Sequence, residues 1–400
     1  MKILVVTPEV PYPLNNGGRL RVYHLVRCLV YSGHDVTVIT YGSGPSSLKC
    51  DWFGSDRAFR LVQVPKPSRL VRIFSFLRAL GSGVPYRFAF YSTGAMRKAV
   101  RRLLNNGQDL CLVEYLAMVC NVSFRGRCQY VIDTHNVEYR RAEQAFSRKP
   151  SLLARLYVAH VKRYEARKLN IADCVLACSE TDAGYFKSLT TRAPIHVVPN
   201  GVDVQFYGTR YKTESTHKTV LFVGSLDYRP NIEGLQWFIN EIWPKVMSHY
   251  PEAEFHIVGR SPKEEVTMWN MRSGVKIYAD VPDVREYLQT ASIVVVPLKS
   301  GSGTRLKILE AMASRKPIIS TTIGAEGINC THGKNIVLAD NSDAFVEAIL
   351  RLFADAEYRS RIAEEAWRLV SKEYDWRSVG EELDRCVREI VRARPKSESR

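Results

Sequence analysis

The sequence predicts an α/β protein built from two doubly wound domains that face each other across a cleft. Short apolar runs rich in β-branched residues alternate with helical patterns through both halves of the chain, as expected for parallel strands buried on both faces. The chain has 400 residues and 46% hydrophobic content, which is enough to bury the cores of two domains.

The first half opens with a strand–helix–strand unit. Strands are predicted at Ile3–Thr7 and Val36–Thr40, with a helix over Arg19–Tyr31 between them. Gly17 and Gly18 lie in the turn after the first strand, at the edge of the sheet where ligands bind in open α/β folds. Further elements of this half are predicted strands at Leu110–Val113, Tyr130–Ile132 and Cys174–Cys178, and a basic helix over 150–170.

The segment from Pro67 to Asn105 departs from this alternation. SRLVRIFSFLRAL combines apolar residues at helical spacing with arginines, and aromatic residues and a second basic stretch follow. Such a basic, apolar helix is typical of an element at a membrane surface or of a groove that binds a partner. The alternative is a helix whose apolar stripe belongs to the core and whose arginines are solvated.

The second half begins with a predicted strand at Val220–Val223, after a polar segment from Gln205 to Lys218 that is predicted to be a linker. A helix over Ile232–Ile242 is predicted to end near Pro244. The later elements are strands at Phe255–Val258, Val275–Tyr278, Ile293–Pro297 and Pro317–Thr321, and helices at Leu306–Ala313, from Ser342, over 355–373 and over Val379–Val391.

The stretch from Ile293 to Gly327 predicts a ligand site. Its strand runs into the small residues Gly301 to Thr304, with Thr304 as a possible N-cap, and a helix follows. Free backbone N–H groups and the positive dipole end of such a helix suit a phosphate. We interpret this as a nucleotide-sugar site; the alternative is an ordinary strand–helix–strand unit.

Charged side chains strengthen that interpretation. Arg305 and Lys307 place two cations at the predicted helix start, and Lys307 and Glu310 share one face of the helix. We expect the backbone amides and cations to bind the phosphates and Glu310 to bind the ribose hydroxyls.

Net charge and cysteine content narrow the class of protein. Residues 1–200 hold 29 Lys and Arg against 13 Asp and Glu, whereas residues 201–400 hold 28 of each, so the formal charge of +16 lies in the first half. This predicts an anionic partner, and the absence of a nucleic-acid motif favours a membrane or a phosphorylated acceptor over nucleic acid.

The nine cysteines form no C-x-x-C pair, which predicts reduced thiols, a cytoplasmic location and no zinc site. MKILVVTPEV predicts a first strand rather than a signal peptide, and no apolar run reaches the length of a membrane span.

GSGTRLKILEAMASRKPIISTTIGAEG resembles the donor-site signature of glycosyltransferase family 4, in its bacterial exopolysaccharide-type branch. The resemblance covers roughly residues 1–390 and implies the GT-B fold. It places an acceptor-side domain over 1–203, a donor domain over 204–375 and a terminal helix from 376 that returns to the first domain.

Two departures from the family pattern affect the donor site. The family has two glutamates eight positions apart; the second matches Glu310 and the first falls on Ser302. In many members the loop after the strand Val220–Val223 carries an arginine and a lysine that bind diphosphate, and these positions hold Ser225 and Asn231 here. Arg229, Arg305 and Lys307 are the candidates to supply the missing charge.

The resemblance also implies roles for single residues. DTHNVE is similar to the family segment whose histidine, here His135, contacts the transferred sugar, and Val281 to Val284 is similar to the segment that brackets the nucleotide base. The predicted catalytic residues are His135, Glu310, Arg305 and Lys307. The predicted donor-binding residues are Gly17, Gly18, Gly224, Ser225, Arg229, Asn231, Arg260, Val281, Asp283, Ser302, Gly303, Thr304 and Glu310.

The function implied is a retaining transfer of a sugar from a nucleotide diphosphate sugar to a hydroxyl acceptor, with neither a metal nor another cofactor. We expect a glycan or lipid-linked acceptor, an anionic membrane surface as a partner, no nucleic acid, and a peripheral position on the inner face of the membrane. Two alternatives stay open. One is a sugar-nucleotide epimerase on the same fold, and the other is a nucleotide-sugar-binding protein without catalysis, which Ser225, Asn231 and Ser302 would suit.

Overall fold

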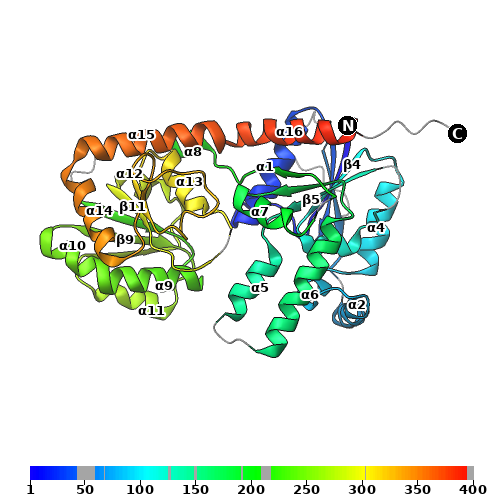
Figure 1. Ribbon diagram of the computed structural model, residues 1–400, viewed down its shortest axis with the longest axis horizontal. Coiled ribbons are helices and arrows are strands. Elements are labelled where there is room, and N and C mark those ends of the chain that lie inside the picture. The colour runs from blue at the N-terminus through cyan, green and yellow to red at the C-terminus, as the bar shows by residue number, and fades with distance from the viewer. Residues whose placement is uncertain are drawn as a thin grey trace. The chain divides into compact units, whose positions relative to one another are not determined.

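The computed structural model describes residues 1–42, 59–66, 68–124, 128–147, 151–190, 192–208, 218–301 and 303–393. The chain divides into two compact units (Figure 1). Unit 1 consists of Met1–Pro199 and Val379–Arg400, and unit 2 consists of Asn200–Ser378. The sequence-based domains divide the chain at 203/204 and 375/376.

Unit 1 is built on a parallel sheet whose described strands run in the order β3-β2-β1-β4-β5-β6-β7. The order reverses between β1 and β4, so the loops that follow these two strands diverge at the carboxyl edge of the sheet and leave a crevice. The strands are β1 Lys2–Val6, β2 Asp35–Tyr41, β3 Phe59–Val64, β4 Leu110–Glu114, β5 Gln129–Thr134, β6 Cys174–Ala177 and β7 Ile195–Val197.

Helices cover both faces of this sheet. Alternate residues of β1 point to opposite sides, and Leu4 and Val6 pack into a buried cluster with Met96 and Val100 of α4. On the chain's return, α16 lies beside α1, where Cys28 of α1 closely approaches Gly380 of α16. The helices of unit 1 are α1 Gly17–Tyr31, α2 Arg69–Gly81, α3 Tyr86–Ala89, α4 Gly94–Leu104, η2 Leu116–Asn121, α5 Glu138–Phe146, α6 Leu152–Leu169, α7 Glu180–Lys187 and α16 Trp376–Arg392, whose first three residues belong to unit 2.

Unit 2 has the same kind of architecture. Within 218–301 and 303–393 its parallel strands run in the order β10-β9-β8-β11-β12-β13, with the reversal between β8 and β11. The strands are β8 Thr219–Val223, β9 Glu254–Gly259, β10 Val275–Ala279, β11 Ile293–Val296, β12 Ile318–Ser320 and β13 Val337–Leu338. The helices are α8 Val204–Gly208, α9 Arg229–Trp237, η3 Phe238–Ile242, α10 Trp243–His249, α11 Glu264–Thr267, η4 Met268–Met271, α12 Arg285–Thr290, α13 Leu306–Ala313, α14 Ser342–Ala354 and α15 Ala356–Glu373.

Three local predictions were wrong. The helix expected to end near Pro244 continues through the π-helical turn η3 into α10, because Pro244 occupies the first turn of α10, where a proline leaves no hydrogen bond unmade. The polar segment from Gln205 begins as the short helix α8 rather than as a linker. Arg305, not Thr304, takes the N-cap position of α13, and it makes no side-chain capping bond.

Several predicted positions lie outside the described residues, namely Pro67, Ser302 and the linker residues 209–217. Across the ranges that the structure describes, no helix is long and apolar enough to pass through a membrane.

Candidate active site

The first candidate site lies at the carboxyl edge of the sheet of unit 2, beside the reversal between β8 and β11. The turn after β11 contains Gly301 and Gly303, whose φ angles of +116° and +80° are in the left-handed region that glycine adopts without strain. The first turn of α13 then follows without a side-chain cap. The N–H of Ile308 donates to the backbone oxygen of Arg305, so the N–H groups of Leu306 and Lys307 are the ones available to an anion. The hydroxyl oxygen of Thr304 is also buried here and has no hydrogen-bond partner among the described residues.

Lys307 connects this turn to the loop after β8. Its Nζ donates a hydrogen bond to Oδ1 of Asn231 over 3.0 Å, and Nδ2 of Asn231 donates to the backbone oxygen of Ser225 over 2.7 Å. The ammonium also lies 4.1 Å from the centroid of the Phe222 ring. A Cβ at Gly224 would stand 2.5 Å from Nζ, so a glycine at this position leaves the room that Lys307 occupies.

Burial lowers the pKa of both cations at the start of α13. Desolvation, followed by the charge of Arg305, lowers the pKa of Lys307 to about 7, and Glu310 opposes the shift only in part. The pKa of Arg305 is lowered as well, again mainly by burial. Since no described carboxylate forms an ion pair with Lys307, an anion that enters here would gain a strong partner.

Glu310 faces Tyr207, a residue that the sequence did not single out. A side-chain hydrogen bond joins the two, and burial raises the pKa of Glu310 while Tyr207 and then Lys307 oppose the rise. The pKa of Tyr207 is raised by burial and by the adjacent carboxylate. Tyr207 escaped prediction because it lies on α8, in a segment whose polar composition predicts a linker.

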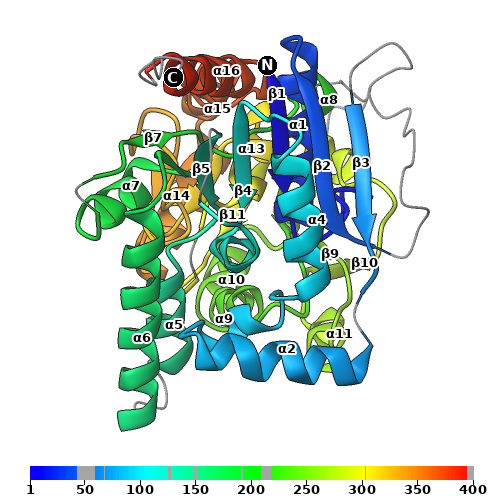
Figure 2. The ribbon, with the colours of Figure 1, turned by 90° about the vertical axis from the view of Figure 1, so that its right-hand side faces the viewer.

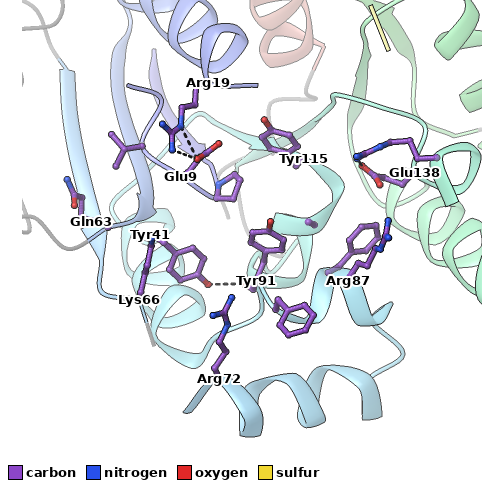
Figure 3. Close-up of a pocket in the computed structure, with 17 residues that line it drawn as sticks. Glu9, Arg19, Tyr41, Gln63, Lys66, Arg72, Arg87, Tyr91, Tyr115 and Glu138 are labelled. Atoms are coloured by element: carbon purple, nitrogen blue, oxygen red, sulfur yellow. Dashed lines mark hydrogen bonds and ion pairs between the residues drawn. The ribbon is translucent and has the colours of Figure 1, made fainter. Parts of the chain in front are cut away.

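The second candidate site is a cavity of about 980 Å³ in unit 1 (Figure 3). It lies beyond the carboxyl ends of the strands next to the reversal between β1 and β4. Its basic, acidic and aromatic lining residues are Arg19, Lys66, Arg72, Arg87, Arg141, Glu9, Glu138, Tyr41, Phe88, Phe90, Tyr91 and Tyr115.

The cavity has more positive charge than its own carboxylates neutralise. Arg19 pairs with Glu9 over 2.5 Å, and the side chain of Glu138 is paired in the same way with Arg141. In contrast, no carboxylate of the described residues forms an ion pair with the remaining cations of the wall, which are Lys66, Arg72 and Arg87. The cavity therefore suits an anionic ligand, and its aromatic side chains suit one with an apolar part.

His135 belongs to a buried polar cluster and contacts Tyr115, a lining residue of this cavity. Its Nε2 is 2.8 Å from Oε2 of Glu114, and Arg21 donates two hydrogen bonds of 2.7 Å to the carboxylate of Asp133. Burial, with the charge of Arg21, lowers the pKa of His135 to about 3, so the imidazole is neutral at physiological pH. The pKa of Glu114 is raised by burial and by the charge of Asp133, and Arg21 keeps Asp133 ionised.

Tyr115 joins the cluster to the cavity wall. Its ring stacks on His135 with 3.6 Å between ring centroids, and an added Cβ at Gly18 would stand 1.8 Å from its hydroxyl oxygen. Its backbone has φ +67° and ψ 135°, a conformation that strains any residue with a side chain. Such strain at a cavity wall indicates a functional position. The signal in the sequence that could have identified Tyr115 was its position directly after a buried strand.

Comparison with known proteins places the chain in a family. Residues 15–206 match the family model described as Glycosyltransferase Family 4, and residues 217–355 match that of Glycosyl transferases group 1. A Klebsiella pneumoniae protein, described as an uncharacterized 44.6 kDa protein in the cps region, is 24% identical over 94% of this chain and 97% of its own. A phosphatidyl-myo-inositol mannosyltransferase of Mycolicibacterium smegmatis is 25% identical over 48% of this chain and 51% of its own.

Solved structures share the fold. Sucrose-phosphate synthase from Thermosynechococcus elongatus superposes with a TM-score of 0.73 at 16% identity, over 98% of this chain and all of that one. Anabaena HepE in complex with UDP-glucose gives a TM-score of 0.67 at 17% identity, over 97% of this chain and all of that one. The chain belongs to the family 4-type glycosyltransferases. Its two parallel-sheet units are the Rossmann-like domains of the GT-B fold, as predicted.

The remaining predicted residues of this glycosyltransferase make separate contacts within unit 2. Arg229 has a side chain 74% exposed and pairs with Glu233 over 2.8 Å. Asp283 is held by Arg285 at 2.6 Å. Arg260 is exposed, and its backbone oxygen accepts a hydrogen bond from Leu226. Val281 is half-buried, and the hydroxyl of Ser225 donates to Asp227 over 2.6 Å.

The structure thus gathers the predicted donor residues of the glycosyltransferase only in part. Lys307 and Asn231 are in contact, and Gly224 makes room for them. Arg229 is engaged by a surface carboxylate, whereas Arg305 and Lys307 lie at the start of α13. His135, Gly17 and Gly18 belong to unit 1, whereas the other predicted residues belong to unit 2.

Proposed function

We propose that the protein transfers a sugar from a nucleotide diphosphate sugar to a hydroxyl group of a lipid-linked glycan or polysaccharide precursor, with retention of anomeric configuration. One observation carries the donor half of this proposal: a buried lysine whose pKa is about 7 stands at an uncapped helix start without an ion-pair partner among the described carboxylates. Anabaena HepE, which shares the fold, was solved in complex with UDP-glucose, and this fits a donor of the same class.

In this reaction the bond between the sugar's anomeric carbon and the diphosphate oxygen breaks, and a bond to the acceptor oxygen forms. The first turn of α13, Arg305 and Lys307 stabilise the negative charge that builds up on the departing diphosphate. The acceptor proton goes to the leaving phosphate oxygen on the same face of the sugar, and Glu310 holds the ribose. No metal ion takes part, because these cations carry the charge that a divalent ion would otherwise carry.

A binding screen followed by a transfer assay tests the donor half. Nucleoside diphosphate sugars of different bases are added in thermal-shift measurements. A ligand that binds only the folded state raises the melting temperature of the protein. Nucleotide release that depends on an added acceptor supports transfer. Conversion of the donor to an isomeric sugar without acceptor would indicate an epimerase instead, and binding without any turnover would indicate a binding protein.

The cavity of unit 1 supports an acceptor that carries phosphate. Lys66, Arg72 and Arg87 face it without carboxylate partners in the described chain, and a phosphate or diphosphate ester supplies the complementary charge. Its aromatic wall suits the first carbons of a lipid. A neutral, soluble saccharide would leave these cations without a partner.

Exposed apolar side chains support delivery of that acceptor from a membrane. Helix α2 and the free end of the α5–α6 pair lie at the end of unit 1 opposite α16 (Figure 2). Both expose large apolar side chains to solvent, which is unusual for surface helices without a partner. These residues, between 39% and 78% exposed, are Leu70, Val71, Ile73, Phe74, Leu77 and Leu80 of α2 and Leu152, Leu153 and Leu156 of α6.

Co-sedimentation with liposomes tests the membrane half. Binding should rise with the fraction of anionic lipid and fall with salt, because each basic residue near an anionic surface contributes about 1 kcal/mol and is screened within a Debye length. Phe74→Asp and Arg78→Glu on α2 should weaken it, whereas Arg361→Glu, a charge reversal on α15 of unit 2, should not. Equal binding to neutral and anionic vesicles, or none to either, would refute the membrane role.

A further inference from the structure

A cluster of metal-ligand side chains lies in unit 1 outside both candidate sites. Cys174 on β6, His196 on β7 and Cys386 on α16 bring their sulfur and ring nitrogen atoms within 4.8 Å of one another. Both cysteines are buried free thiols, and His196 is half-buried. The His196 ring makes no hydrogen bond or ion pair with another described residue, so no such contact competes with a metal for its nitrogen.

The sheet register explains why these residues meet. His196 pairs with Leu176 in the parallel ladder of β6 and β7, and Cys174 lies two residues before Leu176. Because side chains alternate along a strand, Cys174 and His196 point to the same face of the sheet. Helix α16 covers this face and adds Cys386, which shares a side-chain hydrogen bond with Cys174. The site therefore exists only when the last helix is docked.

We propose that Cys174, His196 and Cys386 bind one Zn²⁺ ion that fastens α16 to the sheet of unit 1. Two thiolates and an imidazole are a ligand set that zinc prefers. In a tetrahedral site with metal–sulfur bonds of about 2.3 Å, neighbouring ligand atoms stand about 3.8 Å apart. The observed separations, all within 4.8 Å, need only a small contraction to reach that geometry.

A carboxylate is available for the fourth position. Glu389 follows Cys386 by three residues on α16 and so shares its face of the helix. It lines a cavity of about 350 Å³ together with His196 and Asp173. Asp173 already accepts a hydrogen bond from the backbone of Tyr130 over 2.7 Å, whereas Glu389 makes no side-chain interaction with another described residue.

Zinc content of the full-length protein tests this proposal. Zinc binds thiolates, so metal binding must release the thiol protons of both cysteines and should strengthen with pH. We expect about one zinc per chain after expression with added Zn²⁺. Cys174→Ser and Cys386→Ser should each abolish it, and His196→Asn, at a half-buried position that tolerates a polar side chain, should weaken it. The matched control is Cys111→Ser, which alters an equally buried cysteine on β4 and should keep the metal.

Two further measurements separate a metal site from a cluster of core thiols. The Co²⁺-loaded protein should show thiolate-to-metal charge-transfer absorption that Cys386→Ser removes. Chelation should speed hydrogen exchange in the part of α16 after Val379 and leave α4 unchanged, because only α16 depends on the metal. Wild-type protein without zinc, zinc retained by both serine variants, or a Cys174–Cys386 disulfide in protein isolated without reductant would overturn the proposal. None of these readouts involves sugar transfer.

Discussion

The protonation of Lys307 should control donor affinity near neutral pH. In the free protein its pKa is lowered from 10.5 to about 7, so the ammonium is already losing its proton at pH 7. A diphosphate ester stays ionised throughout this range and prefers the charged lysine. Donor binding above pH 7 must therefore take up a proton, and the dissociation constant should rise with pH.

The size of the effect follows from that pKa. Below pH 7 Lys307 is mostly charged and the dissociation constant should be nearly constant. Above pH 7 it should increase up to tenfold per pH unit, which gives about a 30-fold weakening between roughly pH 6 and pH 8.5. The stability of the free protein has the opposite trend, because the unfolded chain binds more protons than the folded chain between pH 7 and 10.5. Lys307 should thus make folding more favourable as pH rises through this window.

Titration calorimetry with the donor found by the screen measures the dissociation constant and the number of protons taken up. The number of protons taken up, obtained from buffers of different ionisation enthalpy, should approach one per donor above pH 8. Lys307→Met keeps the aliphatic stem over Phe222 and removes the charge, so its affinity should be weak and independent of pH. A wild-type affinity that is flat from pH 6 to 8.5, or a variant that shows the same slope, would refute this account of Lys307.

Three other single substitutions and one double variant test neighbouring parts of the two sites. Glu310→Gln should weaken donor binding about ten- to a hundredfold without unfolding the protein, since a hydrogen bond to a charged group contributes about 1.5–3 kcal/mol; unchanged affinity by calorimetry would exclude Glu310 as the ribose ligand. Arg305→Ala should lower turnover more than the melting temperature, and a variant that melts early but turns over normally would mark the arginine as structural. Gly18→Ala should lower the melting temperature and the activity, because the new methyl group overlaps the Tyr115 hydroxyl, and Tyr115→Phe should restore stability in the double variant.

Much of the fold was predictable because its strands are short, apolar and buried on both faces. Ile293–Pro297 and Val220–Val223 were predicted to within a residue or two of β11 and β8. The errors occurred where local signals conflict with the context. Pro244 normally ends a helix, but here a π-helical turn changes the register so that the proline begins a new one.

The site was less predictable because its important contacts join distant parts of the chain. Glu310 and Lys307 were found through their spacing on one helix. Tyr207 lies 103 positions before Glu310, and no periodicity marks it. Cys174 and Cys386 are 212 positions apart, so the absence of C-x-x-C pairs gave no sign that the fold brings them together. Sequence spacing indicates sites within one element and misses sites that tertiary packing assembles.

In the proposed donor site, the departures from the family pattern move the positive charge to other residues and do not remove it. At the position where many relatives have a lysine, Asn231 accepts a hydrogen bond from Lys307 and donates one to the loop after β8. Its amide therefore holds the Lys307 ammonium in place, whereas a lysine at 231 would repel it. Desolvation lowers the pKa of Lys307 to about 7, so part of the lysine population is uncharged at neutral pH until a bound anion favours the ammonium. A binding protein without catalysis would need the same cation to hold a diphosphate, so acceptor-dependent release of nucleotide is the measurement that separates it from an active transferase.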